Sequence, residues 1–338
     1  MAFRFKLGEP FEEGVRRIIV EQITRAQAQL GDKGDHAVAV HETRKGLKRL
    51  RALLRLIRPA IGEDAFRREN AQLRDIGLSL SGARDRHVLL ETANKLEGAA
   101  GMGRKGLIGG LRACIAAANG EGLPLSMQQA QDRLAEANDR LAALHIEGSG
   151  FDIVGAGLER SYRKARRAFA HAYDHPTEEA FHEWRKGAQA HWRQMTLLAR
   201  AWPEYLGARA SEARTLSQLL GDDHDLAMLV AFVHSEAAAA ISGEQAALIE
   251  KAARQRQTEL REASRPRGDR LFAEAPKRLR RSIGAYWQAA AALKEHELDE
   301  ATADRPVKRI RRQSAPRRRL PGAAKPGAKG HPKAHAKA

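Results

Sequence analysis

Cysteine is almost absent from this chain of 338 residues, and aromatic side chains are few. The single cysteine, Cys114, excludes an internal disulfide framework and a zinc site made of several cysteines. Aromatic residues make up 5% of the chain, a composition poorly suited to stacking on single-stranded bases. No apolar run approaches the roughly 18 residues of a membrane span, and residues 1–10 lack the apolar core of a secretory signal. We therefore expect a cytoplasmic protein without a membrane span.

Positive charge is in excess, but it is unevenly distributed. The chain has 59 Lys and Arg against 42 Asp and Glu, a formal net charge of +17. Residues 305–338 hold twelve of the basic residues, five of the twelve prolines and no acid, which leaves +5 for residues 1–304. Such a segment cannot bury enough apolar surface to fold, so we expect a disordered basic tail. The tail is either a solubilising extension or a nonspecific tether to polyanions, nucleic acid included.

The rest of the chain predicts an all-α fold. Ala, Leu, Arg, Glu and Gln dominate, and no sustained alternation of apolar β-branched residues indicates a strand. Glycine and proline divide the sequence into about ten helices. The expected breaks include 148–150, Pro203, Gly207, Gly243 and Pro266.

Two short motifs occur twice, in the same order. HETRKG at residues 41–46 returns as HEWRKG at 182–187, and LSGARD at 80–85 aligns with LGDDHD at 220–225. The offsets are 141 and 140 residues, and Arg74 falls opposite Arg214. This internal repeat predicts two pseudo-symmetric helical bundles, residues 1–150 and 151–304, followed by the tail at 305–338. Matching faces of the bundles would enclose a basic central cavity.

The first motif of each half lies on a helix with one cationic face. At about 100° per residue, the leucines of residues 37–58 fall opposite the basic residues. The aligned basic positions are His41, Arg44, Lys45, Lys48, Arg51 and Arg55 in the first half and His182, Arg185, Lys186, Arg193 and Arg200 in the second. No acid interrupts the first stripe, and like charges at these spacings repel. Three explanations stay open. An anionic ligand could offset the repulsion, acids on neighbouring helices could pair with the basic residues, or water could solvate the whole cationic face.

The second motif places Arg84 and His224 directly before Asp85 and Asp225, near the expected start of a helix. We interpret each Asp as a helix cap, with Arg84 or His224 directed at the cavity. The histidines lack the spacing of a zinc-binding pair, and no phosphate-binding loop, nucleophile elbow or dinucleotide fingerprint occurs. We therefore predict no metal, no cofactor and no enzymatic activity.

At these residues the chain resembles the CHAD family, histidine-containing α-helical domains that bind inorganic polyphosphate. The similarity rests on residues 40–56, 80–85, 181–186 and 219–226 and covers roughly residues 1–300. It implies two bundles around a basic cavity that holds the polymer, and an association with polyphosphate or polyhydroxyalkanoate storage granules. The implied ligand residues are His41, Arg44, Lys45, Lys48, Arg51, Arg55, Arg84, His182, Arg185, Lys186, Arg193 and His224, to which we add the aligned pair Arg74 and Arg214. The chain has Gln189 at a position where the family usually has a basic residue. We therefore expect the second half to bind the ligand less tightly than the first.

The leading hypothesis is a non-enzymatic protein that binds inorganic polyphosphate. The main alternative is an architectural protein that binds nucleic acid through the cavity and the basic tail. A third hypothesis is an enzyme that acts on phosphate or nucleotide substrates. The sequence offers no catalytic nucleophile, general base or metal-binding cluster for such an enzyme.

Overall fold

The protein is described by a computed structural model, which covers residues 3–32, 34–80, 82–99, 105–118 and 126–303. Within these ranges it does not describe the side chains of residues 82–85, 99, 105–107 and 297–303. The side chain of Arg84 and the expected tail at 305–338 therefore lie outside the described residues. The described part contains helices and no strand, which confirms the all-α prediction.

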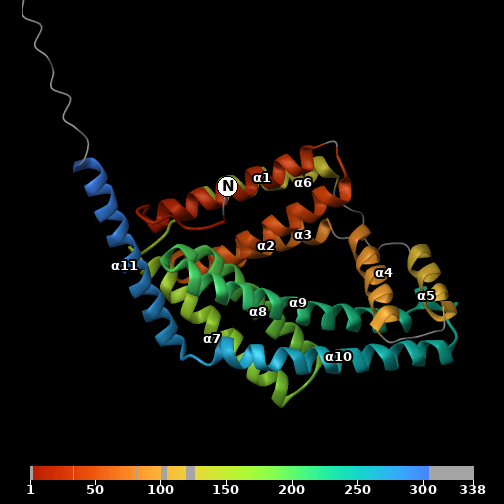
Figure 1. Ribbon diagram of the computed structural model, residues 1–338. Helices are drawn as coiled ribbons and strands as arrows, with labels where there is room; N and C mark the ends of the chain where they lie inside the picture. The colour runs from red at the N-terminus through yellow and green to blue at the C-terminus, as the bar shows by residue number, and fades with distance from the viewer. Residues whose placement is uncertain (1–2, 33, 81, 100–104, 119–125, 304–338) are drawn as a thin grey trace, which may run out of the picture. The chain divides into compact units, whose positions relative to one another are not determined.

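The helices follow one another with short connections (Figure 1). In chain order they are α1 (Phe11–Gly31), α2 (His36–Ile61), α3 (Glu63–Ser79), α4 (Gly82–Ala99), α5 (Lys105–Ala117), α6 (Met127–Ala142), α7 (Asp152–Asp174), α8 (Glu178–Leu198), α9 (Pro203–Val233), α10 (Gly243–Phe272) and α11 (Pro276–Ala303). Two short 3₁₀ helices, η1 (Ala199–Ala201) and η2 (Glu236–Ala238), flank α9. The chain divides into one compact unit, residues 1–297, and a second unit, residues 298–338.

The two helices that carry the first motif begin at side-chain caps. The carboxylate of Asp35 accepts a hydrogen bond from the backbone N–H of Ala37 at the start of α2. The hydroxyl of Thr177 accepts one from the N–H of Ala180 at the start of α8. Both caps satisfy a backbone donor that has no partner inside its helix. At the other end of α2, Gly62 has a φ of 78°, a backbone conformation that favours glycine, and the chain turns there into α3.

Three of the expected helix boundaries are wrong. Gly207 lies inside α9, and Pro266 lies inside α10. His224 and Asp225 also lie within α9, so Asp225 does not cap a helix. Pro266 removes one backbone hydrogen bond from α10. The helix continues because its buried face packs tightly against other helices. This packing is so close at Gly268 that an added Cβ would collide with the rings of Phe169 and Trp184. Tertiary packing thus outweighs the local cost.

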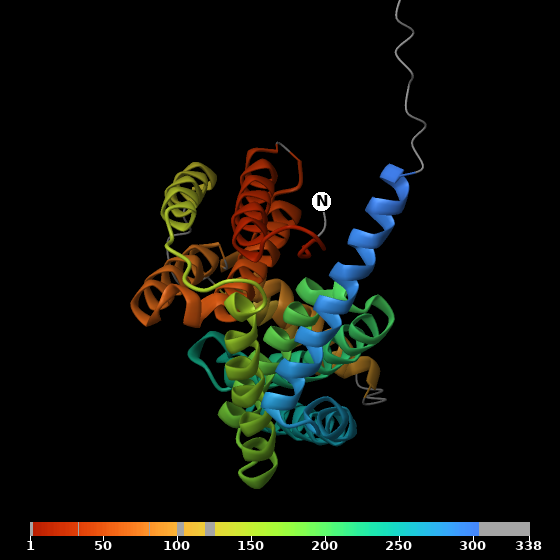
Figure 2. The same ribbon diagram turned by 90° about the vertical axis from the view of Figure 1, so that its left-hand side faces the viewer.

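The larger hydrophobic core joins helices from both sides of residue 150. It includes Leu53 of α2, Leu134 of α6, Tyr162 of α7 and the fully buried Trp184 of α8. Figures 1 and 2 show α6 alongside α1, and the helix pairs α2–α7 and α2–α8 are in contact. The motif helices α2 and α8 therefore share one core.

A second core also crosses residue 150. Ala93 and Leu96 of α4 and Ile115 of α5 pack with Leu229 of α9 and Ile249 of α10. Figure 1 shows α4 and α5 beside the ends of α9 and α10. The boundary at 150 falls in the connection between α6 and α7, and the division into two pseudo-symmetric halves stays a prediction.

Close backbone contact holds α2 against α7. A Cβ added to Gly157 of α7 would overlap the backbone carbonyl of Leu56 in α2. About two turns further along α7, a Cβ on Gly187 of α8 would lie 2.7 Å from the Cβ of Ala165. Only glycine permits these approaches, so α7 sets the positions of both motif helices.

Candidate functional site

One cavity receives basic side chains from both motif helices. Its volume is about 620 Å³. Arg44 and Lys48 of α2 line it together with Arg185 and Lys186 of α8. The remaining lining residues are Leu78 of α3, Val88 and Leu89 of α4, His182 and Gln189 of α8, His224, Asp225, Met228, Ala231 and Phe232 of α9, and Ser235. Six of the fourteen residues expected to bind the ligand thus meet at this cavity.

Two histidines from different helices stack beside these cations. The ring centroids of His182 and His224 are 4.4 Å apart, with an angle of 31° between the rings. Nδ1 of His182 is buried and has no hydrogen-bond partner. Burial lowers the pKa of His182, and the charges of Lys186 and Arg185 lower it further. Burial, Arg185 and His182 lower the pKa of His224 to about 4. Both rings are therefore neutral near pH 7 when the cavity holds no anion.

Several arginines of α2 and α8 lie next to other arginines, with Arg193 buried and Arg55 partly buried. Burial and the neighbouring Arg51 and Arg58 lower the pKa of Arg55 to about 10, opposed by the charge of Glu183. Burial likewise lowers the pKa of Arg193 to about 10, and its charged neighbours are Arg49 and Arg55. This is a costly arrangement, because positive charges that repel each other have been removed from water. It leaves the contact between α2 and α8 strongly electropositive.

The polar contacts of these arginines are mostly to uncharged groups. Nε of Arg51 donates to the side-chain oxygen of Asn70 over 3.0 Å. A guanidinium nitrogen of Arg193 donates to the carbonyl of Gln189 over 2.9 Å. The Arg193 guanidinium also lies 4.6 Å from the ring of Trp192. These contacts orient the guanidinium groups without neutralising them.

A second hollow, of about 330 Å³, adjoins the first and shares Lys186 with it. Arg55 and Arg58 of α2 line this hollow, together with Arg160 and Lys164 of α7. Three of these cations, Arg58, Arg160 and Lys164, are not among the residues expected from the sequence to bind the ligand. Arg58 could have been found, because it lies three residues after Arg55 on the same face of α2; Arg160 and Lys164 belong to no motif.

The lysine of each motif has an acidic partner on its own helix. Nζ of Lys45 lies 3.1 Å from a carboxylate oxygen of Glu42, and Lys186 forms the equivalent ion pair with Glu183. Glu183 also pairs with Lys164 of α7, over 3.3 Å. Although no acid interrupts the row of basic residues on α2, Lys45 thus has an acidic partner within its own helix. The Glu that follows each motif histidine supplies that partner.

Several expected ligand residues are not among those that line the cavity. His41 and Lys45 are exposed on α2. Arg74 is exposed and pairs with Asp75 over 3.1 Å. Arg214 is exposed too, and its guanidinium lies 5.6 Å from the ring of Trp192.

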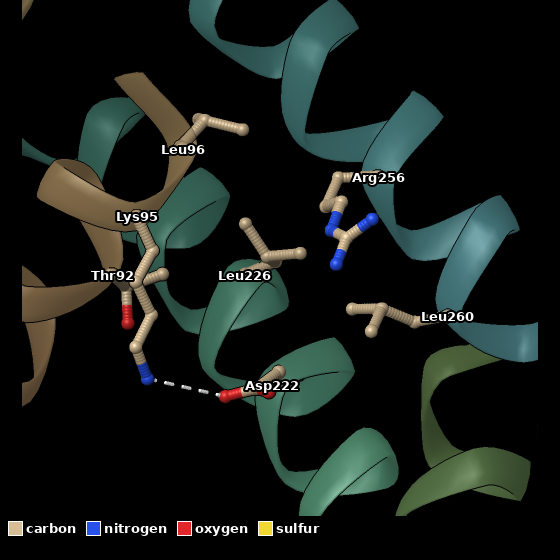
Figure 3. Close-up of a pocket in the computed structure, with 7 residues that line it drawn as sticks. All are labelled: Thr92, Lys95, Leu96, Asp222, Leu226, Arg256 and Leu260. Carbon is tan, nitrogen blue, oxygen red and sulfur yellow. Dashed lines mark hydrogen bonds and ion pairs between the residues drawn. The ribbon is translucent and has the colours of Figure 1, made fainter. Parts of the chain in front are cut away.

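A smaller hollow of about 260 Å³ between α4, α9 and α10 is less suited to a polyanion (Figure 3). Lys95 of α4 points across it toward Asp222 of α9, and Nζ lies 3.4 Å from the carboxylate. Arg256 of α10 faces them, Leu226 lies between these charged groups in this view, and Leu96 and Leu260 also line the hollow. Because Asp222 offsets one of the two cations and the leucines carry no charge, this hollow has little net positive charge. The described residues contain no group of three or more His, Cys, Asp or Glu placed to hold a metal ion.

Comparison with protein families identifies the domain. A family model described as the CHAD domain matches residues 17–234, more than half of the chain. The protein belongs to the CHAD domain family. The match begins in α1 and ends just after α9, so α10 and α11 lie outside it, and the similarity is shown over a shorter span than residues 1–300. No curated protein matches the chain. Among the helices described for this CHAD protein, none is both long and apolar enough to span a bilayer.

Proposed function

We propose that this CHAD protein binds inorganic polyphosphate in the cavity between α2, α8 and α9. The observation that carries the proposal is the convergence of Arg44 and Lys48 with Arg185 and Lys186 on one cavity. Each guanidinium can donate two parallel hydrogen bonds to phosphate oxygens, and each ammonium adds a mobile positive charge. Cations spaced by turns of a helix suit a ligand whose anionic groups also repeat.

The buried arginines support an anionic ligand. The charges of Arg55 and Arg193 are weakly compensated, and an anion placed near them gains more than it would at an exposed lysine. Since the second hollow shares Lys186 with the cavity, a chain of phosphates can contact both hollows at once. His182 and His224 donate hydrogen bonds when neutral and add charge when protonated.

The proposed role is binding without catalysis. It extends to recruiting the protein to polyphosphate or polyhydroxyalkanoate granules in the cytoplasm, with the basic tail as an additional contact. Release of phosphate during prolonged incubation of polyphosphate with the protein and magnesium would contradict the non-catalytic part of this proposal.

The proposal is tested by comparing two double variants of the full chain. We expect Arg44→Ala with Lys48→Ala to weaken binding of long polyphosphate at least about tenfold in calorimetric titrations, because both side chains line the cavity. The matched control, Arg311→Ala with Arg312→Ala, removes the same charge from the tail and should cost less than about threefold. Equal losses would indicate nonspecific attraction. Unfolding of the cavity variant, measured by circular dichroism, would assign these cations a structural role instead.

A competition experiment separates this function from nucleic-acid binding. Long polyphosphate should displace duplex DNA from the full chain at equal phosphate concentration. Displacement of polyphosphate by DNA under the same conditions would favour the architectural role.

A further inference from the structure

One wall of the cavity is apolar. It is formed by Leu78 at the end of α3, Val88 and Leu89 of α4, and Met228 and Phe232 of α9. Leu78 and Met228 are 58% and 51% exposed, and both are among the few large apolar side chains that the described residues leave open to solvent. Exposed leucine and methionine are ordinary when scattered, but here they face one hollow together. Inorganic polyphosphate has no apolar surface with which to cover them.

The two walls together have the character of a site for a small amphipathic anion. A volume of about 620 Å³ falls within the range usual for small-molecule sites, and such sites combine apolar walls with a few polar groups that fix orientation. Gln189 and Ser235 lie on the lining with an amide and a hydroxyl. The amide of Gln189 can hydrogen-bond the edge of a heterocyclic base, and the hydroxyl of Ser235, which donates to the carbonyl of Phe232 over 2.7 Å, can still accept a hydrogen bond from it.

We propose that the cavity also binds nucleoside polyphosphates, with the phosphates against α2 and α8 and the base against α4 and α9. Arg44, Lys48, Arg185 and Lys186 hold the phosphates as they would hold a polyphosphate segment. The base covers Leu78 and Met228, and flat π-systems pack well against methionine sulfur and aromatic rings such as Phe232. This inference rests on the proposed anion-binding role of the cationic wall and adds a second class of ligand.

The test compares ATP with inorganic tripolyphosphate on the full chain. Both ligands have three phosphates, and tripolyphosphate carries at least as much negative charge, so a purely electrostatic site prefers tripolyphosphate. In magnesium-free calorimetric titrations at one pH and ionic strength, we expect ATP to bind at least about fivefold more tightly. Equal affinities, or tighter binding of tripolyphosphate, would overturn the inference.

Variants of the apolar wall test where the preference arises. Leu78→Gln with Met228→Gln keeps side chains of similar length at two exposed positions, and we expect the ratio of ATP to tripolyphosphate affinity to fall to about one or below. The control Val20→Gln changes an exposed apolar side chain of α1 that does not line the cavity, and should leave the ratio as it is. A preference for ATP that persists in the double variant would overturn the proposed position of the base.

The outcome also separates this inference from the proposed function. If long polyphosphate and tripolyphosphate bind but ATP has no advantage, only the nucleotide inference fails. If ATP binds and long polyphosphate does not, the polyphosphate function fails and the nucleotide site remains.

Discussion

The two copies of the HExRKG motif, on α2 and α8, are similar in sequence and lie in different surroundings. Each has a Glu that pairs with the lysine three residues later, Glu42 with Lys45 and Glu183 with Lys186. The histidines differ: His41 is exposed, whereas His182 is half-buried and stacks on His224. The same six-residue pattern therefore produces a surface histidine in one place and a cavity histidine in the other.

The difference comes from what packs against each helix. Helix α8 packs closely against α9, and α9 supplies His224, Asp225 and, with Met228 and Phe232, part of the apolar wall. Helix α2 contributes Arg44 and Lys48 to the same cavity. A short motif sets the order of charges on a helix, and the neighbouring helix determines which of them reach the cavity.

The largest expected effect concerns how the two helices are held in place. Gly157→Ala places a methyl group against the backbone of α2, which cannot move aside without shifting the helix, and should lower the free energy of unfolding by about 3 kcal/mol or more. Gly187→Ala meets the side chain of Ala165 and should cost less. The control Gly207→Ala, on α9 with open space around it, should stabilise the protein by about 0.5–1 kcal/mol.

Denaturant unfolding of the three variants measures this order. If Gly157→Ala lowers the free energy of unfolding no more than Gly187→Ala does, then α7 does not hold α2 more tightly than it holds α8.

Two further variants exchange the residues of α2 and α8 at the aligned cavity position where one helix has a charged side chain and the other does not. Lys48 of α2 aligns with Gln189 of α8, and both line the cavity. Gln189→Lys should strengthen binding of polyphosphate about threefold to tenfold, and Lys48→Gln should weaken it by a similar factor. Calorimetric affinities for one polyphosphate length test both. If Gln189→Lys and Lys48→Gln shift the affinity for polyphosphate in the same direction, the two positions do not contribute to one shared binding cavity.

The pH dependence of binding should distinguish His182 and His224 from His41. The pKa values of His182 and His224 are lowered, so the unfolded chain takes up protons first and these groups destabilise the fold as pH falls below about 6.5. A bound polyanion raises these pKa values again, so binding should take up protons and strengthen as pH falls from about 7 to about 5. The charged groups that shift these pKa values are Glu178, Glu179, Glu183, Arg185 and Lys186, and the other charged groups that line the cavity are Arg44, Lys48 and Asp225.

Titration of polyphosphate in two buffers of different ionisation enthalpy gives the number of protons taken up. We expect His182→Gln with His224→Gln to reduce that number clearly, and His41→Gln, at an exposed position, to change it little. Proton uptake that depends on His41 alone would reverse the assignment.

The smallest effects are expected at the aligned pair Arg74 and Arg214. Both are exposed; Arg74 pairs with Asp75, and Arg214 lies over Trp192, away from the residues that line the cavity. Alanine at either position should change polyphosphate affinity by less than about twofold in calorimetry, because an exposed charge contributes little. A loss as large as that of Arg44→Ala with Lys48→Ala would extend the binding surface to these arginines.

Much of the fold could be predicted from local signals. Helix propensity and the apolar periodicity of residues 37–58 indicated an all-α protein, and the order of cations on α2 followed from helical spacing. The errors at Gly207 and Pro266 arose because local breaking signals were given more weight than tertiary packing. The pairing of Lys45 with Glu42 was missed although the spacing of three residues allows it.

The sequence by itself determined the helical class, the family motifs and the cationic faces of α2 and α8, because these depend on residues close together along the chain. Only the tertiary structure decided that Arg44 and Lys48 line one cavity together with Arg185 and Lys186, and that His182 stacks on His224. It also decided that α4, from the first 150 residues, packs on α9 and contributes Val88 and Leu89 to the apolar wall of the cavity. Contacts between helices far apart in sequence depend on which faces bury the most apolar surface together, and close approaches such as Gly157 on Leu56 leave α2 little freedom to move.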